Sequence, residues 1–346
     1  MKALASLLVA GALAGAAVAR ARRIPDDLTG EVALVTGASR GLGLLLATEL
    51  ARQGCPLVIC ARDQAELDRA AAQLRSEGAE VTVVACDVTD QAAPAQLVQT
   101  AIERYGRLDI VVSNAGVIQV GPIAVDDQEQ AAATTERFET AVRTMALAPA
   151  RLALAALPGM RARGHGRIVT IASIGGKLSV PHLLPYSTAK FAAVGFSEGL
   201  RAELGRGPVT VTTVVPGLMR TGSHLQARFT GQAEKEFTWF SLGASLPLIS
   251  MDAERAARQI VGAVRERRAE IILTPAGQVV SRVAALAPGV TSEVLNLVQR
   301  LALPAGGGTA EGEISGHDLD PAVPRPVFDR LTTLGRAAAR RFNERS

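Results

Sequence analysis

Short apolar runs alternate with longer stretches of helical periodicity from Glu31 onward. Because these runs are nearly continuous in apolar residues, they predict strands that are buried on both faces of a sheet. The stretch 63–78, which ends at a glycine, predicts one of the intervening helices. The alternation predicts an α/β fold, a doubly wound parallel sheet with helices on both faces. The expected strands span residues 31–37, 56–61, 81–87, 108–116, 166–173, 209–217 and 269–275.

Both ends of the chain depart from this alternation. We expect a single domain with an N-terminal apolar segment and a C-terminal helical extension. The expected parts are the apolar segment at 1–27, the α/β domain at 28–278, an apolar helical extension at 279–304, and a glycine-rich linker with a basic helix at 305–346. The basic helix either packs on the domain, frays, or binds a membrane surface through its arginine-rich face.

The first residues form an uncharged run, 3–19, which is followed by Arg20, Arg22 and Arg23. Its 17 residues are near the minimum for crossing a bilayer. Three interpretations compete: a secretory signal cleaved after residues 17–19, a membrane anchor, or a soluble alanine-rich helix. The arginines favour keeping that side in the cytoplasm. We expect membrane association through residues 3–19 with the domain on the cytoplasmic side; the alternative is a soluble cytoplasmic protein.

Composition and charge narrow the possible partners. The chain has 37 basic and 33 acidic residues, and no lysine-rich block with interleaved aromatics, so nucleic-acid binding is not expected. Cys55, Cys60 and Cys86 lie in apolar stretches without metal-type spacing, which is typical of reduced thiols. The four histidines are scattered, and we expect no metal site.

Glycines cluster in "TGASRGLG", residues 36–43, where the first strand should turn into a helix. Glycines at such a turn let the backbone approach a pyrophosphate, which the helix N-terminus favours electrostatically. An ordinary glycine-rich turn would look the same, and the spacing differs from the commoner G-x-G-x-x-G pattern. This segment alone therefore indicates a dinucleotide site without establishing one.

Tyr186 and Lys190 lie four positions apart in "YSTAK". On a helix this spacing places both side chains on one face, so that the ammonium group can influence the phenol. A half-buried tyrosine beside a solvated lysine has the same spacing. Other motifs must decide between the two interpretations.

Six motifs occur in order along the chain, and together they are far more specific than any one of them. They are "TGASRGLG" (36–43), "CDVTD" (86–90), "SNAG" (113–116), Ser173, "YSTAK" (186–190) and "PG" (216–217). In order and spacing the chain resembles the short-chain dehydrogenase/reductases over residues 28–275. The resemblance implies a single Rossmann-type domain and a homo-oligomer, either a dimer or a tetramer.

The resemblance also implies catalytic roles. Tyr186 would be the general acid and base, Ser173 would bond to the substrate oxygen, and Lys190 would hold the nicotinamide ribose. A phenol has a pKa of about 10, and positive charge at Lys190 and on the nicotinamide is expected to lower it. One position departs, because Met145 falls where the family has an asparagine. The family's proton relay uses that residue's backbone carbonyl to hold a water, which Met145 can supply if its helix is locally distorted.

The cofactor implied by the resemblance is NADP rather than NAD. Ala61 stands where NAD-preferring members carry an acid, while Arg62 and Arg40 offer guanidinium groups for a 2′-phosphate. Asp87 would accept from the adenine amino group. The expected cofactor-binding residues are Thr36, Gly37, Ser39, Arg40, Gly41, Leu42, Gly43, Arg62, Asp87, Val88, Asn114, Ala115, Gly116, Tyr186, Lys190, Pro216, Gly217 and Thr221.

The substrate is expected to bind under a segment that follows the P-G motif, residues 218–250. This segment contains Phe229, Phe237, Trp239 and Phe240, which could enclose an apolar substrate, pack in the core, or face a membrane. We expect an NADP-dependent oxidoreductase that interconverts a secondary alcohol and a ketone on a lipid-like or steroid-like compound. The alternatives are a catalytically silent NADP-binding regulatory or scaffold protein, and an epimerase or dehydratase of a neighbouring branch. His182, near Tyr186 in sequence, is interpreted as a loop histidine.

Overall fold

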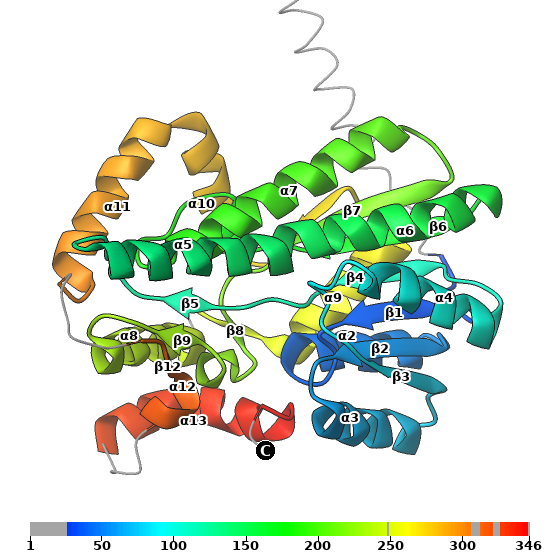
Figure 1. The fold of residues 1–346 in the computed structure, drawn as a ribbon, viewed down its shortest axis with the longest axis horizontal. Helices are drawn as coiled ribbons and strands as arrows, with labels where there is room; N and C mark the ends of the chain where they lie inside the picture. The colour runs from blue at the N-terminus through cyan, green and yellow to red at the C-terminus, as the bar shows by residue number, and fades with distance from the viewer. Residues whose placement is uncertain (1–25, 248, 306–311, 321–325, 345–346) are drawn as a thin grey trace, which may run out of the picture.

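Seven parallel strands form the central sheet of the computed structural model, which describes residues 26–247, 249–305, 312–320 and 326–344 (Figure 1). Their order is β3-β2-β1-β4-β6-β7-β11, so the chain starts in the middle and winds outward in both directions. All seven predicted strands are confirmed. They are β1 (Ala33–Thr36), β2 (Leu57–Ala61), β3 (Val81–Ala85), β4 (Ile110–Ser113), β6 (Gly166–Ile171), β7 (Val209–Val215) and β11 (Glu270–Ile272).

Several strands end earlier than predicted, and the difference is functional. The run 108–116 was expected to be a strand throughout, but β4 ends at Ser113 and residues 114–116 form a loop. Likewise β6 ends at Ile171, two residues before Ser173.

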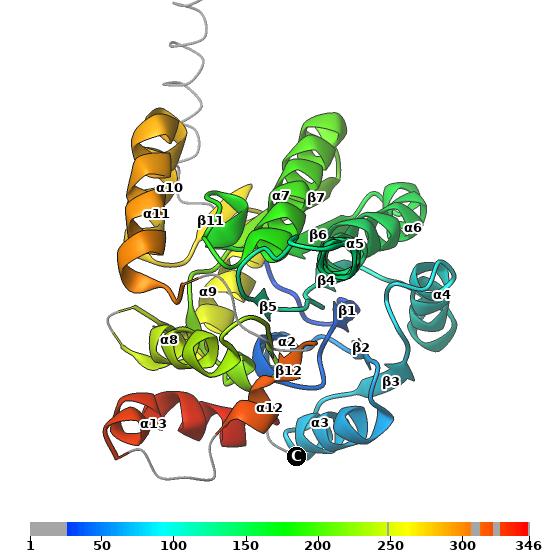
Figure 2. The same cartoon turned by 60° about the vertical axis from the view of Figure 1, so that its left-hand side comes forward.

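Helices cover both faces of the sheet, as predicted (Figure 2). One apolar core joins the sheet to α2 (Gly41–Arg52), α3 (Gln64–Ser76) and α9 (Ala253–Arg265). The second joins the opposite face to α4 (Ala93–Tyr105), α6 (Ala148–Ala162) and α7 (Leu184–Leu204). The doubly wound Rossmann-type architecture is thus confirmed.

A long helix leads into α6. It begins as α5 (Gln128–Val142), passes through the π-helix η1 (Arg143–Leu147) and continues as α6. Among the described residues, this helix of 35 residues is long and apolar enough to cross a membrane by length and composition. It packs against α4 and α7, so we assign it to the fold.

Very short strands, which no periodicity could predict, organise the lid segment, residues 218–250. Two of its strands pair outside the central sheet, and a helix with a buried aromatic face follows. The elements here are β5 (Gln119–Val120), β8 (Met219–Arg220), η3 (Ser223–Leu225), β9 (Arg228–Phe229), α8 (Ala233–Ser245), β10 (Met251–Asp252) and β12 (Ile314–Ser315).

Helices α10 (Pro275–Leu286) and α11 (Pro288–Ala302) form a hairpin that projects from the body (Figures 1 and 2). Its apolar side chains face outward. In α10 the buried residues are Gly277 and Ser281, and α11 buries none. The exposed apolar residues are Val279, Val280, Val283, Leu286, Val290, Val294, Leu297, Val298 and Leu301.

The last helices are α12 (Gly316–Leu319) and α13 (Pro326–Arg341). Helix α13 packs on α8, and Ala339 and Phe342 are buried. The chain end then reaches the loop before α2 (Figure 1). The predicted membrane-associated run 3–19 and most of the glycine-rich linker lie outside the described residues.

Candidate active site

Ser173, Tyr186 and Lys190 meet at the C-terminal edge of the sheet. Ser173 follows β6 in an extended conformation and caps the short helix η2 (Ile174–Gly176), so that its Oγ accepts from the Gly175 N–H (3.1 Å). Tyr186 and Lys190 lie one turn apart near the start of α7, and Lys190 Nζ is 5.6 Å from the centre of the Tyr186 ring. The structure therefore brings these three side chains to one place.

The phenol of Tyr186 is half-buried and borders the apolar lid cluster. Burial raises its pKa, and a hydrogen bond with Ser173 opposes that rise. The expectation that positive charge lowers this pKa is thus not met by the protein's own side chains, because desolvation outweighs the hydrogen bond.

Lys190 is 5% exposed, and its Nζ donates to the carbonyl oxygen of Ile171 (2.8 Å). This bond fixes the ammonium group at the end of β6. Burial lowers the pKa of Lys190 to about 8. Near neutral pH the group remains mostly charged, next to the phenol that it is expected to influence.

Met145 lies within the π-helix η1, where the helix is wider than an α-helix. Its side chain is 2% exposed and packs against Tyr186 and Ala189. A local distortion therefore exists at the position where the family resemblance asked for one. The thioether supplies an apolar wall beside the phenol.

The glycine-rich loop between β1 and α2 is packed too closely for larger residues. A Cβ added to Gly43 would lie 2.0 Å from the Gly37 carbonyl oxygen, and one added to Gly37 would lie 2.8 Å from Ala115 Cα. The Asn114 amide holds the loop by donating to the carbonyl oxygens of Thr36 (3.1 Å) and Gly37 (3.1 Å). Asn114 thus shapes the loop as well as lining the site.

These elements enclose a cavity of about 780 Å³. Its size falls within the range of ligand pockets. Every expected site residue except Thr36 lines it: Gly37, Ser39, Arg40, Gly41, Leu42, Gly43, Arg62, Asp87, Val88, Asn114, Ala115, Gly116, Ser173, Tyr186, Lys190, Pro216, Gly217 and Thr221.

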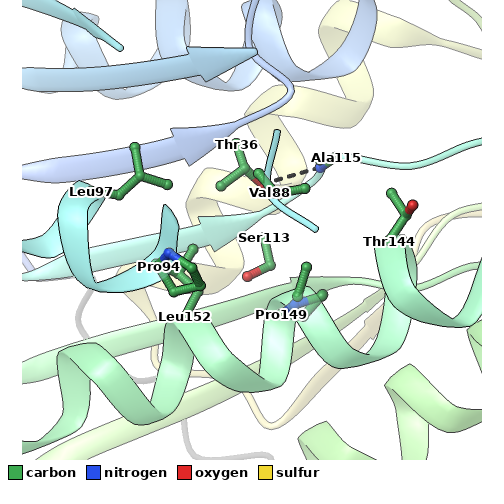
Figure 3. A pocket seen from close by; sticks show the side chains of 10 residues that line it. Thr36, Val88, Pro94, Leu97, Ser113, Ala115, Thr144, Pro149 and Leu152 are labelled. Carbon is green, nitrogen blue, oxygen red and sulfur yellow. Dashed lines mark hydrogen bonds between the residues drawn. The ribbon is translucent and has the colours of Figure 1, made fainter. Parts of the chain in front are cut away.

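Thr36 does not line this cavity; it lies beneath the residues that do. Its hydroxyl oxygen accepts from the Asn114 and Ala115 N–H groups (3.0 and 3.1 Å), which ties β1 to the loop after β4. Figure 3 shows it beside a second, much smaller cavity of about 10 Å³, which also contains Ser113. Thr36 therefore supports the site from behind.

Charged groups gather at the rim of the large cavity, near the start of α2. Arg40 Nη1 donates to both carboxylate oxygens of Glu66 (2.6 Å each), and Ser39 donates to Glu66 (3.0 Å). Arg40 Nε also lies 3.4 Å from Glu344 Oε2. Arg62 is exposed at the same rim. We call Arg40, Glu66 and Glu344 the phosphate rim.

The arrangement fits a nicotinamide dinucleotide. The glycine-rich loop lines the cavity at the N-terminus of α2, where a diphosphate is favoured. The Glu344 side chain lies beside Gly41 at this position. Arg40 and Arg62 stand where a further phosphate could be held, and Lys190 and Tyr186 lie at the opposite end of the same cavity. Within the described residues, no cluster of three His, Cys, Asp or Glu side chains could hold a metal.

The aromatic residues of the lid segment serve mainly as packing. Phe229, Phe237 and Phe240 are at most 5% exposed and contact one another edge to face. The cavity wall next to Tyr186 instead includes Val117, Ile118 and Met145. Of the three interpretations of these aromatics, the structure favours core packing.

Sequence reasoning missed a buried polar group that ties this segment to α7. His182, just before α7, has a positive φ of 62°, and its Nδ1 lies 2.8 Å from Glu236 Oε1. Glu236 is fully buried and also accepts from the Trp239 indole N–H (2.6 Å). Glu66 and Glu344 at the phosphate rim were missed too, since neither lies in a motif.

A family model described as short chain dehydrogenase matches residues 31–230. A protein described as a ketoacyl reductase of the granaticin polyketide synthase of Streptomyces violaceoruber is 37% identical over 238 residues, which cover 67% of this chain and 85% of that protein. Dehydrogenase/reductase SDR family member 4 of Bos taurus is 37% identical over 201 residues, covering 58% of this chain and 69% of that protein.

Solved structures agree. A short chain dehydrogenase/reductase from Burkholderia phymatum in complex with NAD has a TM-score of 0.67 at 25% identity, covering 76% of this chain and 96% of that chain. The family match ends at residue 230, directly after β9. Helix α8, the α10–α11 hairpin and the C-terminal helix all lie beyond it.

Proposed function

The chain belongs to the short-chain dehydrogenase family, and we propose that it is an NADP-dependent oxidoreductase that interconverts a secondary alcohol and a ketone. Family membership makes it an oxidoreductase of CH–OH groups that uses a nicotinamide cofactor. The observation that carries the proposal is the convergence of Ser173, Tyr186 and Lys190 on one cavity with the glycine-rich loop. When bound, the nicotinamide would supply or accept the hydride.

In the proposed reaction Tyr186 handles the proton. It donates to the ketone oxygen during reduction and takes the proton from the alcohol during oxidation. Ser173, whose oxygen is held by the Gly175 N–H, bonds to the same substrate oxygen and orients it. Lys190, fixed by the Ile171 carbonyl, would hold the nicotinamide ribose, and its charge together with that of the oxidised nicotinamide would favour the phenolate of Tyr186.

The preference for NADP is supported by the charges at the rim. Arg40 and Arg62 line the cavity, and the residue at the end of β2 is Ala61 rather than an acid. Guanidinium groups bind phosphate through charge-assisted hydrogen bonds. The acid nearest to this strand end, Asp63, caps α3 by accepting from the Glu66 N–H (2.8 Å). The two guanidinium groups therefore favour the 2′-phosphate of NADP over a ribose 2′-hydroxyl.

An apolar, lipid-like or steroid-like substrate is supported by the wall beside Tyr186. Val117, Ile118 and Met145 form this wall. The ketoacyl reductases among the relatives are named for substrates that carry a ketone on an acyl chain. A ketone with an apolar body would bury that body against the wall while its oxygen meets Ser173 and Tyr186.

We also propose membrane association on the cytoplasmic side through residues 3–19. The outward-facing apolar stripe of α11, which includes Leu297 (56% exposed) and Leu301 (77% exposed), supports it because exposed apolar patches of this kind mark interaction sites. Sedimentation with phospholipid vesicles tests it. We expect the full chain to sediment and a chain starting at Asp26, with Leu297→Ser and Leu301→Ser, to stay in solution. A full chain that stays in solution contradicts the proposal.

We further propose that the protein forms a homo-oligomer. Leu147, Leu154 and Phe191 are 43–57% exposed on neighbouring helices α6 and α7 and on η1 between α5 and α6. Apolar side chains exposed together in this way favour self-association. Light scattering should report a dimer or tetramer, and Leu154→Arg should shift it toward the monomer. A monomeric wild type would exclude this part.

The activity is tested by following nicotinamide absorbance with a panel of ketones, from short ketoacyl thioesters to steroids. We expect NADPH oxidation, faster with apolar ketones. NADPH binding with no turnover on the whole panel would support the silent regulatory protein instead. The assembled Ser173, Tyr186 and Lys190 argue against that alternative.

A further inference from the structure

The chain end, residues 332–344, forms a docked arm, which we call the C-terminal arm. Ala339 is fully buried, and a Cβ added to Gly222 of the lid segment would lie 2.5 Å from Ala339 Cα. Phe342 is 6% exposed and belongs to the core that includes α2 and α9. Arg341 pairs with Glu254 (2.6 Å). Buried apolar contacts therefore fix the arm on the domain.

The end of the C-terminal arm is bonded to the glycine-rich loop. The Gly41 N–H, at the N-terminus of α2, donates to the Phe342 carbonyl oxygen (2.9 Å). The Asn343 amide donates to the Ser39 carbonyl oxygen (2.7 Å), and Asn343 has a φ of 60°, which asparagine tolerates. This turn directs the next side chain, Glu344, toward the loop.

Glu344 points into the large cavity. It is 4% exposed, and a Cβ added to Gly41 would lie 2.5 Å from its Oε1. Its buried Oε2 lies 3.4 Å from Arg40 Nε but receives no well-directed hydrogen bond from the residues that the structure describes. A buried carboxyl group thus stands at the helix N-terminus, where an incoming phosphate would be favoured.

Arg40 consequently faces two carboxyl groups. Its Nη1 donates to Glu66 and its Nε faces Glu344. A phosphate that uses Arg40 must compete with both. Burial raises the pKa of Glu344 to about 8, a rise that the charge of Arg40 opposes and that of Glu66 reinforces.

We propose that Glu344 is a specificity-determining residue of the cofactor site, which weakens binding of NADP relative to NAD by competing for Arg40 and repelling the 2′-phosphate. The inference rests on the proposed dinucleotide site. Both dinucleotides carry the diphosphate, whereas only NADP adds a phosphate with nearly two further charges. The C-terminal arm therefore reduces a preference that Arg40 and Arg62 alone would make stronger.

The test is a dissociation constant for NADP⁺ and for NAD⁺, measured by calorimetry without substrate. For Glu344→Gln at about pH 9, where the wild-type carboxyl group is charged, we expect the ratio of the NAD⁺ to the NADP⁺ dissociation constant to rise about tenfold. An effect of Glu344 at the N-terminus of α2 falls on the diphosphate, which both dinucleotides carry, and cancels in this ratio. Glu344→Ala, which keeps Phe342 and Asn343 in place and adds no new charge, should show the same change. Glu77→Gln is the matched control, because Glu77 pairs with Arg52 (3.0 Å) on the surface, away from the cavity.

The pH dependence gives a second measurement. Below about pH 8 the Glu344 carboxyl group in the folded protein is protonated, and above it the group is charged and repels phosphate. The ratio of wild-type to Glu344→Gln dissociation constants for NADP⁺ should therefore rise severalfold between about pH 7 and about pH 9. The charged or titratable groups that face Glu344 or its partners are Arg40 of the loop, Glu66 of α3, Arg62 and Asp63 at the rim, and His317 beside Gln226.

The outcomes separate this inference from the proposed function. Equal NADP⁺ binding by wild type and Glu344→Gln overturns the inference and leaves the function standing. Weaker NADP⁺ binding by Glu344→Gln also overturns it, because Glu344 would then be a donor to the cofactor. If neither protein binds any dinucleotide, both fail. If NADP⁺ binds only to the variants while NAD⁺ binds to wild type as well, the inference holds in its strongest form.

Discussion

Ser173, Tyr186 and Lys190 form what we call the floor of the cavity. Backbone groups hold Ser173 and Lys190 in place, whereas ion pairs between side chains hold the phosphate rim. On the floor, the Gly175 N–H and the Ile171 carbonyl position Ser173 and Lys190. At the rim, Arg40 is held by carboxylates from α3 and from the chain end.

This difference makes the floor rigid and the phosphate rim adjustable. Backbone groups at the end of β6 cannot move without disturbing the sheet, so the floor has one geometry. Side-chain ion pairs can be exchanged for a ligand's phosphate at modest cost. Substitutions on the floor should therefore have large effects on chemistry, and substitutions at the rim should have graded effects on cofactor choice.

The largest expected effect is at the floor. Tyr186→Phe removes the proton donor, and we expect turnover to fall by about 10²–10⁴-fold. Dinucleotide binding, measured by fluorescence quenching, should change by less than about threefold. Tyr105→Phe is the control, since the Tyr105 hydroxyl bonds to Thr82 (2.9 Å) near the start of β3. This is the edge of the sheet opposite to the cavity. Retained turnover in Tyr186→Phe would show that the floor is not catalytic.

The buried Lys190 gives the next effect, on stability. Its pKa is lowered from 10.5 to about 8, so between these values the unfolded chain binds more protons than the folded protein. Wild-type stability should therefore rise with pH in this window, by roughly 3 kcal/mol in all, relative to Lys190→Met. Urea unfolding at about pH 8 and about pH 10 measures it.

The control for that series is Lys235→Met, because Lys235 is exposed on α8. It should follow wild type at both pH values. If Lys190→Met also follows wild type, the floor lysine is hydrated rather than buried, and the contrast with the rim disappears.

The loop that separates floor from rim should be moderately sensitive. A Cβ at Gly43 would lie 2.0 Å from the Gly37 carbonyl oxygen, so Gly43→Ala must shift backbone. We expect the free energy of unfolding to fall by about 1–3 kcal/mol and dinucleotide binding to weaken. Gly262→Ala on α9, where a Cβ meets nothing within 4 Å, should be neutral or stabilising. Equal behaviour of the two would contradict the close packing of the loop.

The smallest effect is expected at Arg62, which is exposed at the edge of the cavity beside the phosphate rim. Arg62→Ala should weaken NADP⁺ binding about tenfold, because it removes one charge-assisted phosphate contact, and leave NAD⁺ binding nearly unchanged. Calorimetry measures both. Arg161→Ala, at the exposed end of α6, is the matched control. Parallel losses for both dinucleotides would show that Arg62 does not discriminate between them.

The features that could be predicted from the sequence are those that depend on local residue patterns. Apolar runs located all seven strands of the central sheet, and the ordered motifs located residues that the fold brings together at the end of β6 and on α7. The two-residue strands β5, β9 and β12 escaped prediction because such short segments carry no periodicity. Their pairing depends on contacts between distant parts of the chain.

The rim could not be predicted for a related reason. Asn343 lies 304 residues from Ser39, to which it bonds, and Glu344 belongs to no motif. In the protein alone burial raises the pKa of Tyr186, and burial cannot be measured from a motif. The aromatic residues of the lid segment were visible in the sequence, but their role was not. The packing of Phe229 against Phe237 in the structure shows that they fill a core.

The bond between Gly41 and Phe342 has a practical consequence for anyone who purifies the protein. An affinity tag fused after Ser346 would begin three residues beyond Glu344, which lines the large cavity. A histidine-rich tail placed there would add its own ligands and bulk to cofactor titrations. Tags at the opposite terminus, or tags removed by a protease before assay, keep the last residues in their native setting.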